Sequence, residues 1–232
     1  VSHEYVGGLR EISNRNGMEL WVENYGHWGF PGEMLQYGGQ ADVVSGEFWT
    51  QGNLGSIELR AAASAAHTYG KNMVCAESFT SNKPHFVSHP WFFKLRGDWS
   101  FCEGVNQTLL TEYLHQPYTD RIPGINAWFG TAFNRNNTWF FDMDPWTLYI
   151  RRCNFMLQQG LYVADLAYFI GEDAPKMAGI TDPPPPPGYS YDLINGEVIR
   201  ERLGANEEGF ILPDGMSYKL LVLPPLDNMR PG

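Results

Sequence analysis

Cysteine is scarce in this 232-residue chain, and basic charge is in deficit. The three cysteines, Cys75, Cys102 and Cys153, are an odd number without the CxxC spacing of a zinc site. Each lies in an apolar stretch, which predicts buried free thiols. Lys and Arg number 16 against 26 Asp and Glu, a net charge of −10 that argues against a nucleic-acid partner, whose phosphates need a basic surface.

Long apolar runs and phosphate-binding glycine motifs are also missing. No run approaches the roughly 18 residues of a membrane span, and the residues that follow Val1 do not resemble a signal peptide. GxGxxG and Walker patterns are absent, as are internal repeats. We therefore expect a soluble chain with no membrane partner.

Apolar and aromatic residues are plentiful instead. The apolar fraction of 43% is sufficient for a sizeable core. The 8 Trp, 12 Tyr and 14 Phe are more typical of a sugar or ligand surface than of a plain core, and the 25 Gly and 16 Pro predict many shaped loops.

Strand and helix patterns alternate along the first 160 residues. The predicted strands are 18–25, 40–49, 72–79 and 107–115, and the predicted helices are 1–17, 54–69, 91–104 and 146–160. This alternation is typical of a parallel α/β architecture.

Three carboxylates fall at the carboxyl ends of the first three predicted strands: Glu23, Glu47 and Glu77. Catalytic groups of a (β/α)8 barrel lie at those ends. A doubly wound sheet also binds ligands there, but usually shows a glycine-rich phosphate turn. The fold prediction is therefore α/β, with residues 1–160 forming strands five to eight, the C-terminal half of a (β/α)8 TIM-type barrel.

Residues 161–232 have a different composition. A strand is predicted at 164–171, a short helix at 197–203 and a strand at 218–223, and the proline run 183–187 must be extended. The prediction is the beginning of a second α/β domain, cut off at Gly232.

Several long motifs then occur in order. They are GMELWVENYGHWGFPGEMLQYGGQADVVSGEFW (17–49), AAHTYGKNMVCAESFTS (65–81), GVNQTLLTEYLHQPY (104–118), GINAWFGTAFNRNNTWF (124–140) and LPDGMSYKLLVLPP (212–225). Together they resemble glycoside hydrolase family 106, the α-L-rhamnosidases. The resemblance implies removal of terminal α-L-rhamnose from plant polysaccharide or glycosides with inversion, and a calcium ion that binds sugar hydroxyls. It also implies a general acid in an upstream motif that this chain does not contain.

The separation of the carboxylates favours particular roles. An inverting glycosidase holds its acid and base roughly 6.5–9.5 Å apart, whereas neighbouring strands are only about 4.8 Å apart. Glu47 and Glu77 are therefore poorly placed to be acid and base to each other. We assign Glu77 as the general base, with Glu47 as the alternative base or as a residue that holds the water or a metal. Either carboxylate could instead be paired with a neighbouring Arg or Lys.

Four further residues are candidates for substrate binding: Glu23, Glu33, Trp28 and His115. Glu23 could instead form a structural hydrogen bond, and Glu33 could instead be the carboxylate at the start of a helix. Aromatic walls suit the apolar face of rhamnose, although such residues also pack loops, which is our interpretation of the aromatic cluster in 128–141. Calcium takes six to eight oxygens; Glu23, Glu33 or Glu47 could supply some, but no pattern fixes the metal ligands.

Two alternatives stay open. A retaining β-galactosidase-like hydrolase would use Glu77 as nucleophile, and product stereochemistry separates it from an inverting enzyme. The second alternative is a non-catalytic carbohydrate-binding fragment. It stays open because half a barrel leaves two open sheet edges and cannot enclose a site. The isolated chain is accordingly expected to be inactive and poorly soluble. A polymeric substrate implies a periplasmic or extracellular location.

Overall fold

The computed structural model describes residues 1–25, 32–52, 56–130, 132–172, 181–227 and 229. It is a mixed α/β structure with parallel sheets, which confirms the predicted fold class. The chain begins with a π-helical segment, Ser2–Gly7, that continues into α1 (Gly8–Arg15). None of the described helices is long and apolar enough to span a membrane.

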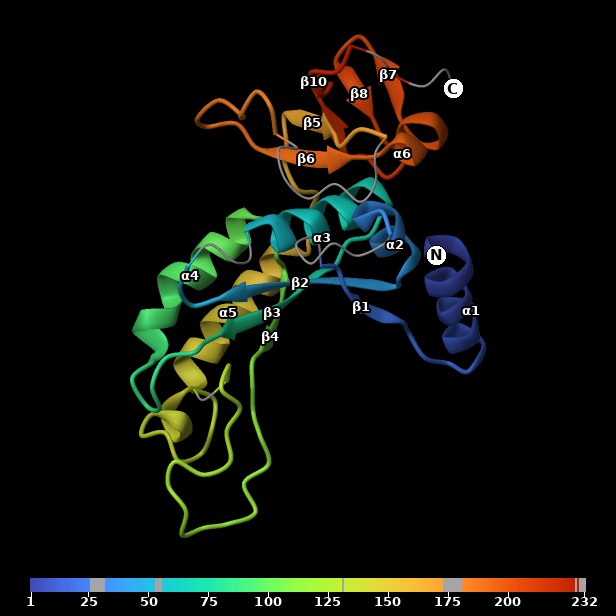
Figure 1. Ribbon diagram of the computed structural model, residues 1–232. Helices are drawn as coiled ribbons and strands as arrows, with labels where there is room; N and C mark the ends of the chain where they lie inside the picture. Colours follow the sequence, from blue (N-terminus) through green and yellow to red (C-terminus); the bar gives the residue numbers. More distant parts are fainter. Residues whose placement is uncertain (26–31, 53–55, 131, 173–180, 228, 230–232) are drawn as a thin grey trace.

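The larger sheet contains four parallel strands in sequential order, β1-β2-β3-β4 (Figure 1). Its strands are β1 (Trp21–Glu23), β2 (Val43–Trp49), β3 (Val74–Thr80) and β4 (Gln107–Leu110). The helices that connect them and follow β4 are α2 (Met34–Gln40), α3 (Ser56–Thr68), α4 (Pro90–Cys102) and α5 (Asp144–Leu157), with a 3-10 turn at Phe140–Asp142 before α5. Sequential parallel order with intervening helices is what four consecutive units of a barrel contribute.

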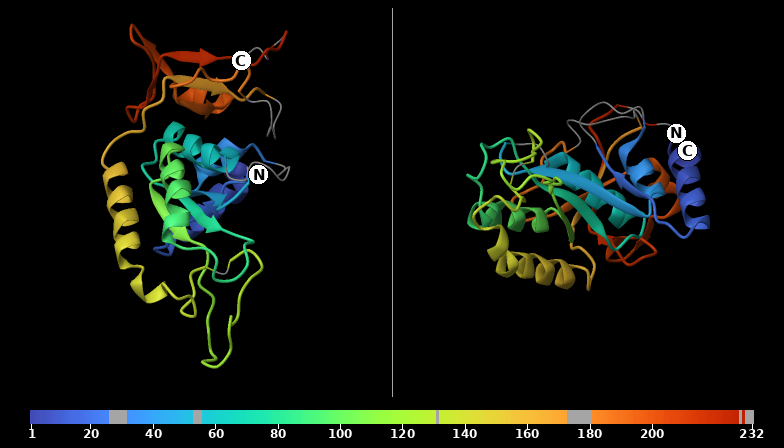
Figure 2. Two further views of the ribbon diagram at one scale, coloured as in Figure 1. Left: turned by 90° about the vertical axis from the view of Figure 1, so that its left-hand side faces the viewer. Right: turned by 90° about the horizontal axis from the view of Figure 1, so that it is seen from below.

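Helix α3 is buried between the two sheets (Figures 1 and 2). It packs on β2 and β3 from one side and on β6 from the other. Its alanines, among them Ala62 and Ala65, are fully buried, as expected for a helix that other elements cover on both sides. Gly46 of β2 permits the close approach, because a Cβ there would lie 2.8 Å from the backbone oxygen of Glu58.

The C-terminal part has a parallel sheet in the order β10-β5-β6 and a small antiparallel sheet, β7-β8-β9. The elements are β5 (Leu166–Phe169), β6 (Tyr191–Ile194), α6 (Gly196–Glu201), β7 (Gly204–Asn206), β8 (Gly209–Ile211), β9 (Ser217–Tyr218) and β10 (Leu220–Val222). Asn195 caps α6 through its side chain, which accepts from the Val198 amide at 2.9 Å. The predicted boundary at residue 160 stays a prediction; one hydrophobic cluster includes both Ala62 and Leu193.

Some elements differ from the sequence prediction. α2 and the strands β6–β8 were not anticipated, because all are short and α2 contains two glycines, which form helices poorly. β4 ends at Leu110 rather than His115, where the bond from the Thr111 amide to the Ser78 carbonyl, at 3.0 Å, closes the ladder. The prediction of three buried thiols is wrong: Cys75 is buried, but Cys102 is exposed, and Cys153 is partly exposed.

Candidate functional site

Three carboxylates lie together on one face of the larger sheet, toward its carboxyl edge. Glu47 of β2 is in direct register with Glu77 of β3. Glu23 ends β1 in register with Ser45, two residues before Glu47. Residues two apart on a strand share a face, so the sheet brings all three predicted carboxylates to the same side, with Glu47 and Glu77 on neighbouring strands as the sequence predicts.

A bulge at Phe79 separates this polar face from the helix-covered core. Simple alternation would place Phe79 on the same side as Glu77. Instead the register shifts after Phe48, and Phe79 has a φ of +68°. Its ring packs in the core against Phe48 at 5.0 Å and Phe93 at 5.2 Å between centroids. A non-glycine residue with this backbone conformation is uncommon, and here it accompanies a Phe79 ring that packs in the core rather than beside Glu77.

Each carboxylate has neighbouring hydroxyl or indole groups. Thr80 donates its hydroxyl to Glu77 Oε1 at 2.7 Å, and the Trp49 indole N–H donates to Glu47 Oε1. The Tyr25 hydroxyl interacts with both Glu23 and Glu47. Tyr25 was missed in the sequence, although its position two residues after a strand-end Glu would have placed it at the same edge.

Burial and mutual repulsion change the protonation of this group. Burial raises the pKa of Glu23 to about 7, and the charges of Glu77 and Glu47 add to the effect, against a hydrogen bond from Tyr25. Burial and the charge of Glu77 also raise the pKa of Glu112, just beyond β4. Among the described residues, no Lys or Arg forms an ion pair with Glu23 or Glu77, and the raised pKa of Glu23 lets this carboxyl keep its proton up to a pH of about 7.

The arrangement therefore contains a proton-holding acid beside other carboxylates. Such a cluster can orient and deprotonate a water molecule. The direct register of Glu47 and Glu77 places them on adjacent strands, about 4.8 Å apart. That is too close for the acid and base of an inverting enzyme, which need roughly 6.5–9.5 Å.

The other predicted substrate-binding residues are placed differently. Glu33 caps α2, accepting from the amides of Leu35 and Gln36 at 2.7 and 3.0 Å, and it also accepts from Asn195 Nδ2 at 2.6 Å. These bonds describe the helix-start role that the sequence left open. His115 is exposed, five residues beyond the end of β4, and Trp28 lies outside the described residues.

The aromatic cluster in 128–141 divides into two groups. Phe133 and Trp139 pack in the core with Trp146, as the loop-core interpretation predicts. Trp128 and Phe141 do not: their exposed fractions are 72% and 79%.

The fit of this site to calcium rests on few protein oxygens. Across the ranges that the structure describes, no three His, Cys, Asp or Glu side chains gather in a metal-binding group. Glu23 Oε1 is buried without a hydrogen-bond partner, however, and carboxylate oxygen is a calcium donor. Calcium would thus take a minority of its oxygens from these residues and the rest from sugar hydroxyls and water.

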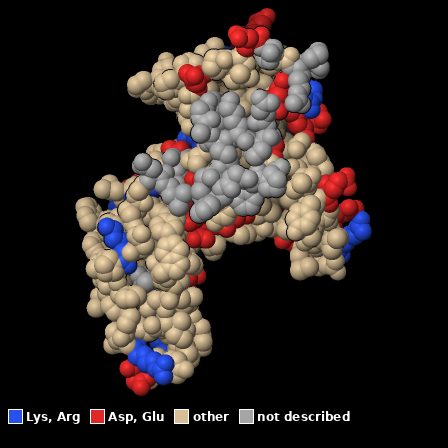
Figure 3. Space-filling model, in the orientation of Figure 1, with Lys and Arg blue, Asp and Glu red and all other residues tan. Residues whose placement is uncertain are grey.

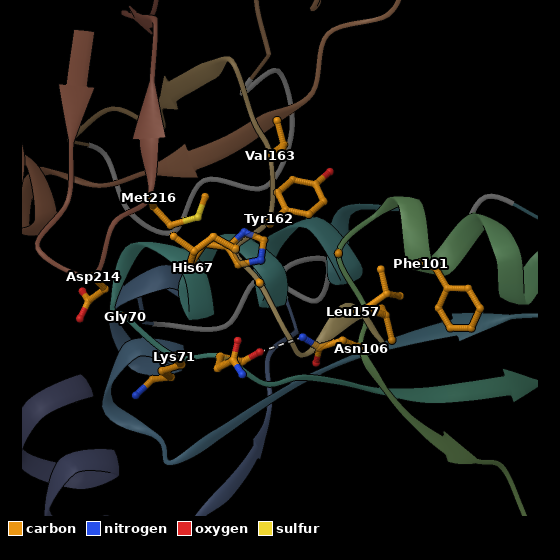
Figure 4. Close-up of a pocket in the computed structure, with 15 residues that line it drawn as sticks. His67, Gly70, Lys71, Phe101, Asn106, Leu157, Tyr162, Val163, Asp214 and Met216 are labelled. Atoms are coloured by element: carbon orange, nitrogen blue, oxygen red, sulfur yellow. Dashed lines mark hydrogen bonds between the residues drawn. The ribbon is translucent and has the colours of Figure 1, made fainter. Parts of the chain in front are cut away.

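A separate cavity of about 480 Å³ lies at the opposite, amino end of the sheet. It is lined by Asn72 and Asn106, which precede β3 and β4, and by His67, which stacks on Tyr162 (Figure 4). Asn106 Nδ2 donates to the Asn72 carbonyl at 2.7 Å. In (β/α)8 barrels, residues at the amino ends of the strands usually serve stability, and the chemistry takes place at the carboxyl ends.

On the molecular face in Figure 3, basic side chains are few and scattered.

Parallel β/α units that gather carboxylates at the carboxyl edge of a sheet are the arrangement found in barrel enzymes, whose catalytic groups lie at that edge. The model of the α-L-rhamnosidase family, glycoside hydrolase family 106, matches residues 1–232, and the chain belongs to this family.

Two known proteins are similar to this chain, one in structure and one in sequence. A rhamnosidase structure from Novosphingobium sp. PP1Y superimposes with a TM-score of 0.83 at 31% identity, covering 96% of this chain and 22% of that one. A protein of Formosa agariphila named putative beta-glucuronidase is 35% identical over 232 residues, which are 100% of this chain and 19% of the relative. The chain thus spans about a fifth of the length of the proteins it matches.

Proposed function

We propose that this chain is part of an inverting α-L-rhamnosidase that removes terminal α-L-rhamnose from plant polysaccharide or glycosides. The observation that carries the proposal is the register of Glu47 with Glu77 on one face, within a chain of family 106. Glu77 acts as the general base, and the general acid comes from a part of the protein outside this chain.

Glu77 is favoured as base by its surroundings. Thr80 fixes one carboxylate oxygen by donating to it at 2.7 Å, which orients the other oxygen for a water molecule. Glu23 retains its proton up to a pH of about 7, so it can donate to Glu77 rather than compete for the same proton. Glu47 accepts from Trp49 and Tyr25, which suits a residue that holds the water.

Calcium belongs to the proposal as a ligand of the sugar. Glu23, with its unpartnered buried oxygen, would hold the ion as the ionised carboxylate, because binding of the cation would release the proton that Glu23 keeps in the absence of calcium. The ion would supply positive charge to the hydroxyls of rhamnose and so position the ring. A plant polysaccharide substrate agrees with a periplasmic or extracellular location, and we propose this location as well.

The test uses the full-length protein that contains this chain, incubated with an aryl α-L-rhamnoside and followed by proton NMR of the anomeric signal. We expect β-L-rhamnose as the first product. α-L-Rhamnose first would mean retention, with Glu77 as nucleophile. Activity on an aryl β-glucuronide in place of the rhamnoside would overturn the substrate and favour the activity in the Formosa relative's name.

The role of Glu77 has its own variants. Glu77→Gln keeps the shape but removes the base, and a lost general base lowers kcat by about 10²–10⁴-fold. Glu207→Gln, at an exposed position in the C-terminal part, is the matched control and should leave kcat unchanged. A larger loss in Glu47→Gln than in Glu77→Gln would transfer the role of base to Glu47.

A further inference from the structure

Trp128 is an exposed tryptophan held in a defined position. It lies in a turn closed by the bond from the Gly130 amide to the Ala127 carbonyl, at 3.3 Å. The Phe129 carbonyl accepts from the Ser81 amide at 2.8 Å, which fixes the turn to the residue after β3. A single exposed apolar side chain is ordinary, but aromatic rings that gather beside polar groups are typical of binding surfaces.

The turn is joined to the carboxylate cluster on two sides. The Trp128 ring lies 5.9 Å from the ring of Trp49, at an interplanar angle of 46°, and Trp49 donates its indole N–H to Glu47. Gly130 packs on Glu112, where a Cβ would meet Glu112 Cγ at 2.7 Å. Trp128 is therefore one aromatic ring away from a candidate catalytic carboxylate.

Polar side chains surround the pair at the ends of β2 and β3. Thr50 donates its hydroxyl to Ser81 Oγ at 3.0 Å, and the side-chain amide of Gln51 donates to Asn82. An aromatic surface beside hydroxyl and amide groups matches the two faces of a sugar ring: C–H groups lie against the electron-rich face of an indole, and hydroxyls bond to the amides.

We propose that Trp128 and Trp49 form the binding surface for the leaving-group sugar, the ring on the far side of the bond that is cleaved. This inference rests on the proposed glycosidase function and narrows its substrate. The preferred leaving group is a pyranose ring, as in an oligosaccharide or polysaccharide, rather than a small alkyl group.

The experiment compares two substrates in the full-length protein: a rhamnosyl disaccharide, whose leaving group is a pyranose, and α-L-rhamnosyl fluoride, whose leaving group has no ring. Trp128→Ala should lower kcat/KM for the disaccharide roughly five- to tenfold, which corresponds to about 1–1.4 kcal/mol. It should leave kcat/KM for the fluoride and inhibition by free rhamnose unchanged. Trp128→Tyr retains an aromatic face and should restore most of the loss.

Phe141→Ala is the control. Phe141 is as exposed as Trp128, but its recorded ring contact is with Phe140, at 5.4 Å, and this variant should change neither substrate. Equal losses on both substrates in Trp128→Ala, or no loss on the disaccharide, would overturn the proposal.

Failure of the proposed function is distinguishable from failure of this inference. An enzyme that cleaves neither rhamnoside but acts on another glycoside overturns the rhamnosidase proposal. The effect of Trp128→Ala on kcat/KM, compared between a disaccharide and a fluoride of that other glycoside, still decides the role of Trp128.

Discussion

Asp192 offers the sharpest test of how the two sheets are held together. Its carboxylate is fully buried and accepts from His67 Nδ1 at 2.9 Å, Tyr218 Oη at 3.0 Å and Ser64 Oγ at 3.2 Å. These partners come from α3 and β9, so one side chain of β6 links three elements. Burial alone would raise the pKa of Asp192, but His67, together with the charge of Arg60 and the hydrogen bond from Tyr218, outweighs burial and holds the pKa below its usual value.

The perturbation is Asp192→Asn. The Asp192 carboxylate accepts hydrogen bonds from three side chains, and hydrogen bonds to a charged group contribute about 1.5–3 kcal/mol each. Asn keeps one acceptor oxygen but loses the charge, so we expect a cost of about 3 kcal/mol. Tyr218→Phe removes one bond from a charge that keeps its other partners, and should cost about 1–2 kcal/mol.

Hydrogen exchange of the full-length protein measures the effect locally. A loss of about 3 kcal/mol makes exchange of the β6 amides more than about a hundredfold faster. The matched control is Asp165→Asn, which breaks a pair with the exposed Lys219, at 2.9 Å, and should cost less than about 1 kcal/mol. The measurement belongs at neutral pH. Because the folded pKa of Asp192 is lowered, its contribution is present above the ordinary value of 3.8 and is lost only as pH falls through the folded pKa.

The reasoning is refuted if Asp192→Asn destabilises β6 no more than Asp165→Asn does. It is also refuted if Tyr218→Phe costs as much as Asp192→Asn, because the carboxylate would then act through a single bond.

Three further outcomes are expected. Since the folded pKa of Glu23 is raised from 4.5 to about 7, its proton stabilises the fold fully below pH 4.5, and this contribution is lost as pH rises through about 7. Glu23→Gln should therefore have the same free energy of unfolding as the wild type at pH 4 and a free energy of unfolding higher by about 1–2 kcal/mol at pH 8, measured by thermal unfolding. This difference is smaller than the full pKa shift implies, because the side chain is half-exposed. Equal stability of the two proteins at pH 8 would contradict the raised pKa. Chelation of calcium should lower activity on an aryl α-L-rhamnoside and added calcium should restore it, whereas unchanged activity would remove calcium from the proposal. Gly46→Ala forces a Cβ within 2.8 Å of the Glu58 carbonyl and should cost about 1–3 kcal/mol in thermal unfolding. Gly8→Ala, which has open space and lies in α1, should cost nothing and slightly stabilise the helix.

The alternation of strands and helices could be read from the sequence because it depends on local pattern. The apolar strands around Glu47 and Glu77, and the alanine-rich helix between them, specify their own secondary structure. Glu residues at the ends of parallel strands must then meet at one edge. This is why the carboxylate cluster was predictable before any coordinates, and family resemblance added the expected substrate.

Other features of the site depend on contacts between segments distant in the sequence. Nothing local indicates that Phe79 leaves the polar face, since its positive φ follows from a register shift against β2 and from the space among Phe48 and Phe93. The sequence left open a place for Glu33 at the start of a helix, and only the structure shows this helix, α2, whose two glycines weaken the helical pattern.

The sequence by itself determined the α/β class, the order of the units and the edge at which Glu23, Glu47 and Glu77 lie. Only the tertiary structure decided that Tyr25 interacts with two of these carboxylates, that Trp128 rests on Trp49 while Trp139 is in the core, and that Asp192 joins β6 to α3. The physical reason is range: periodicity and strand ends are encoded within a few residues, whereas protonation, exposure and ring contacts are set by distant neighbours, 125 residues apart for His67 and Asp192 and 162 for Glu33 and Asn195.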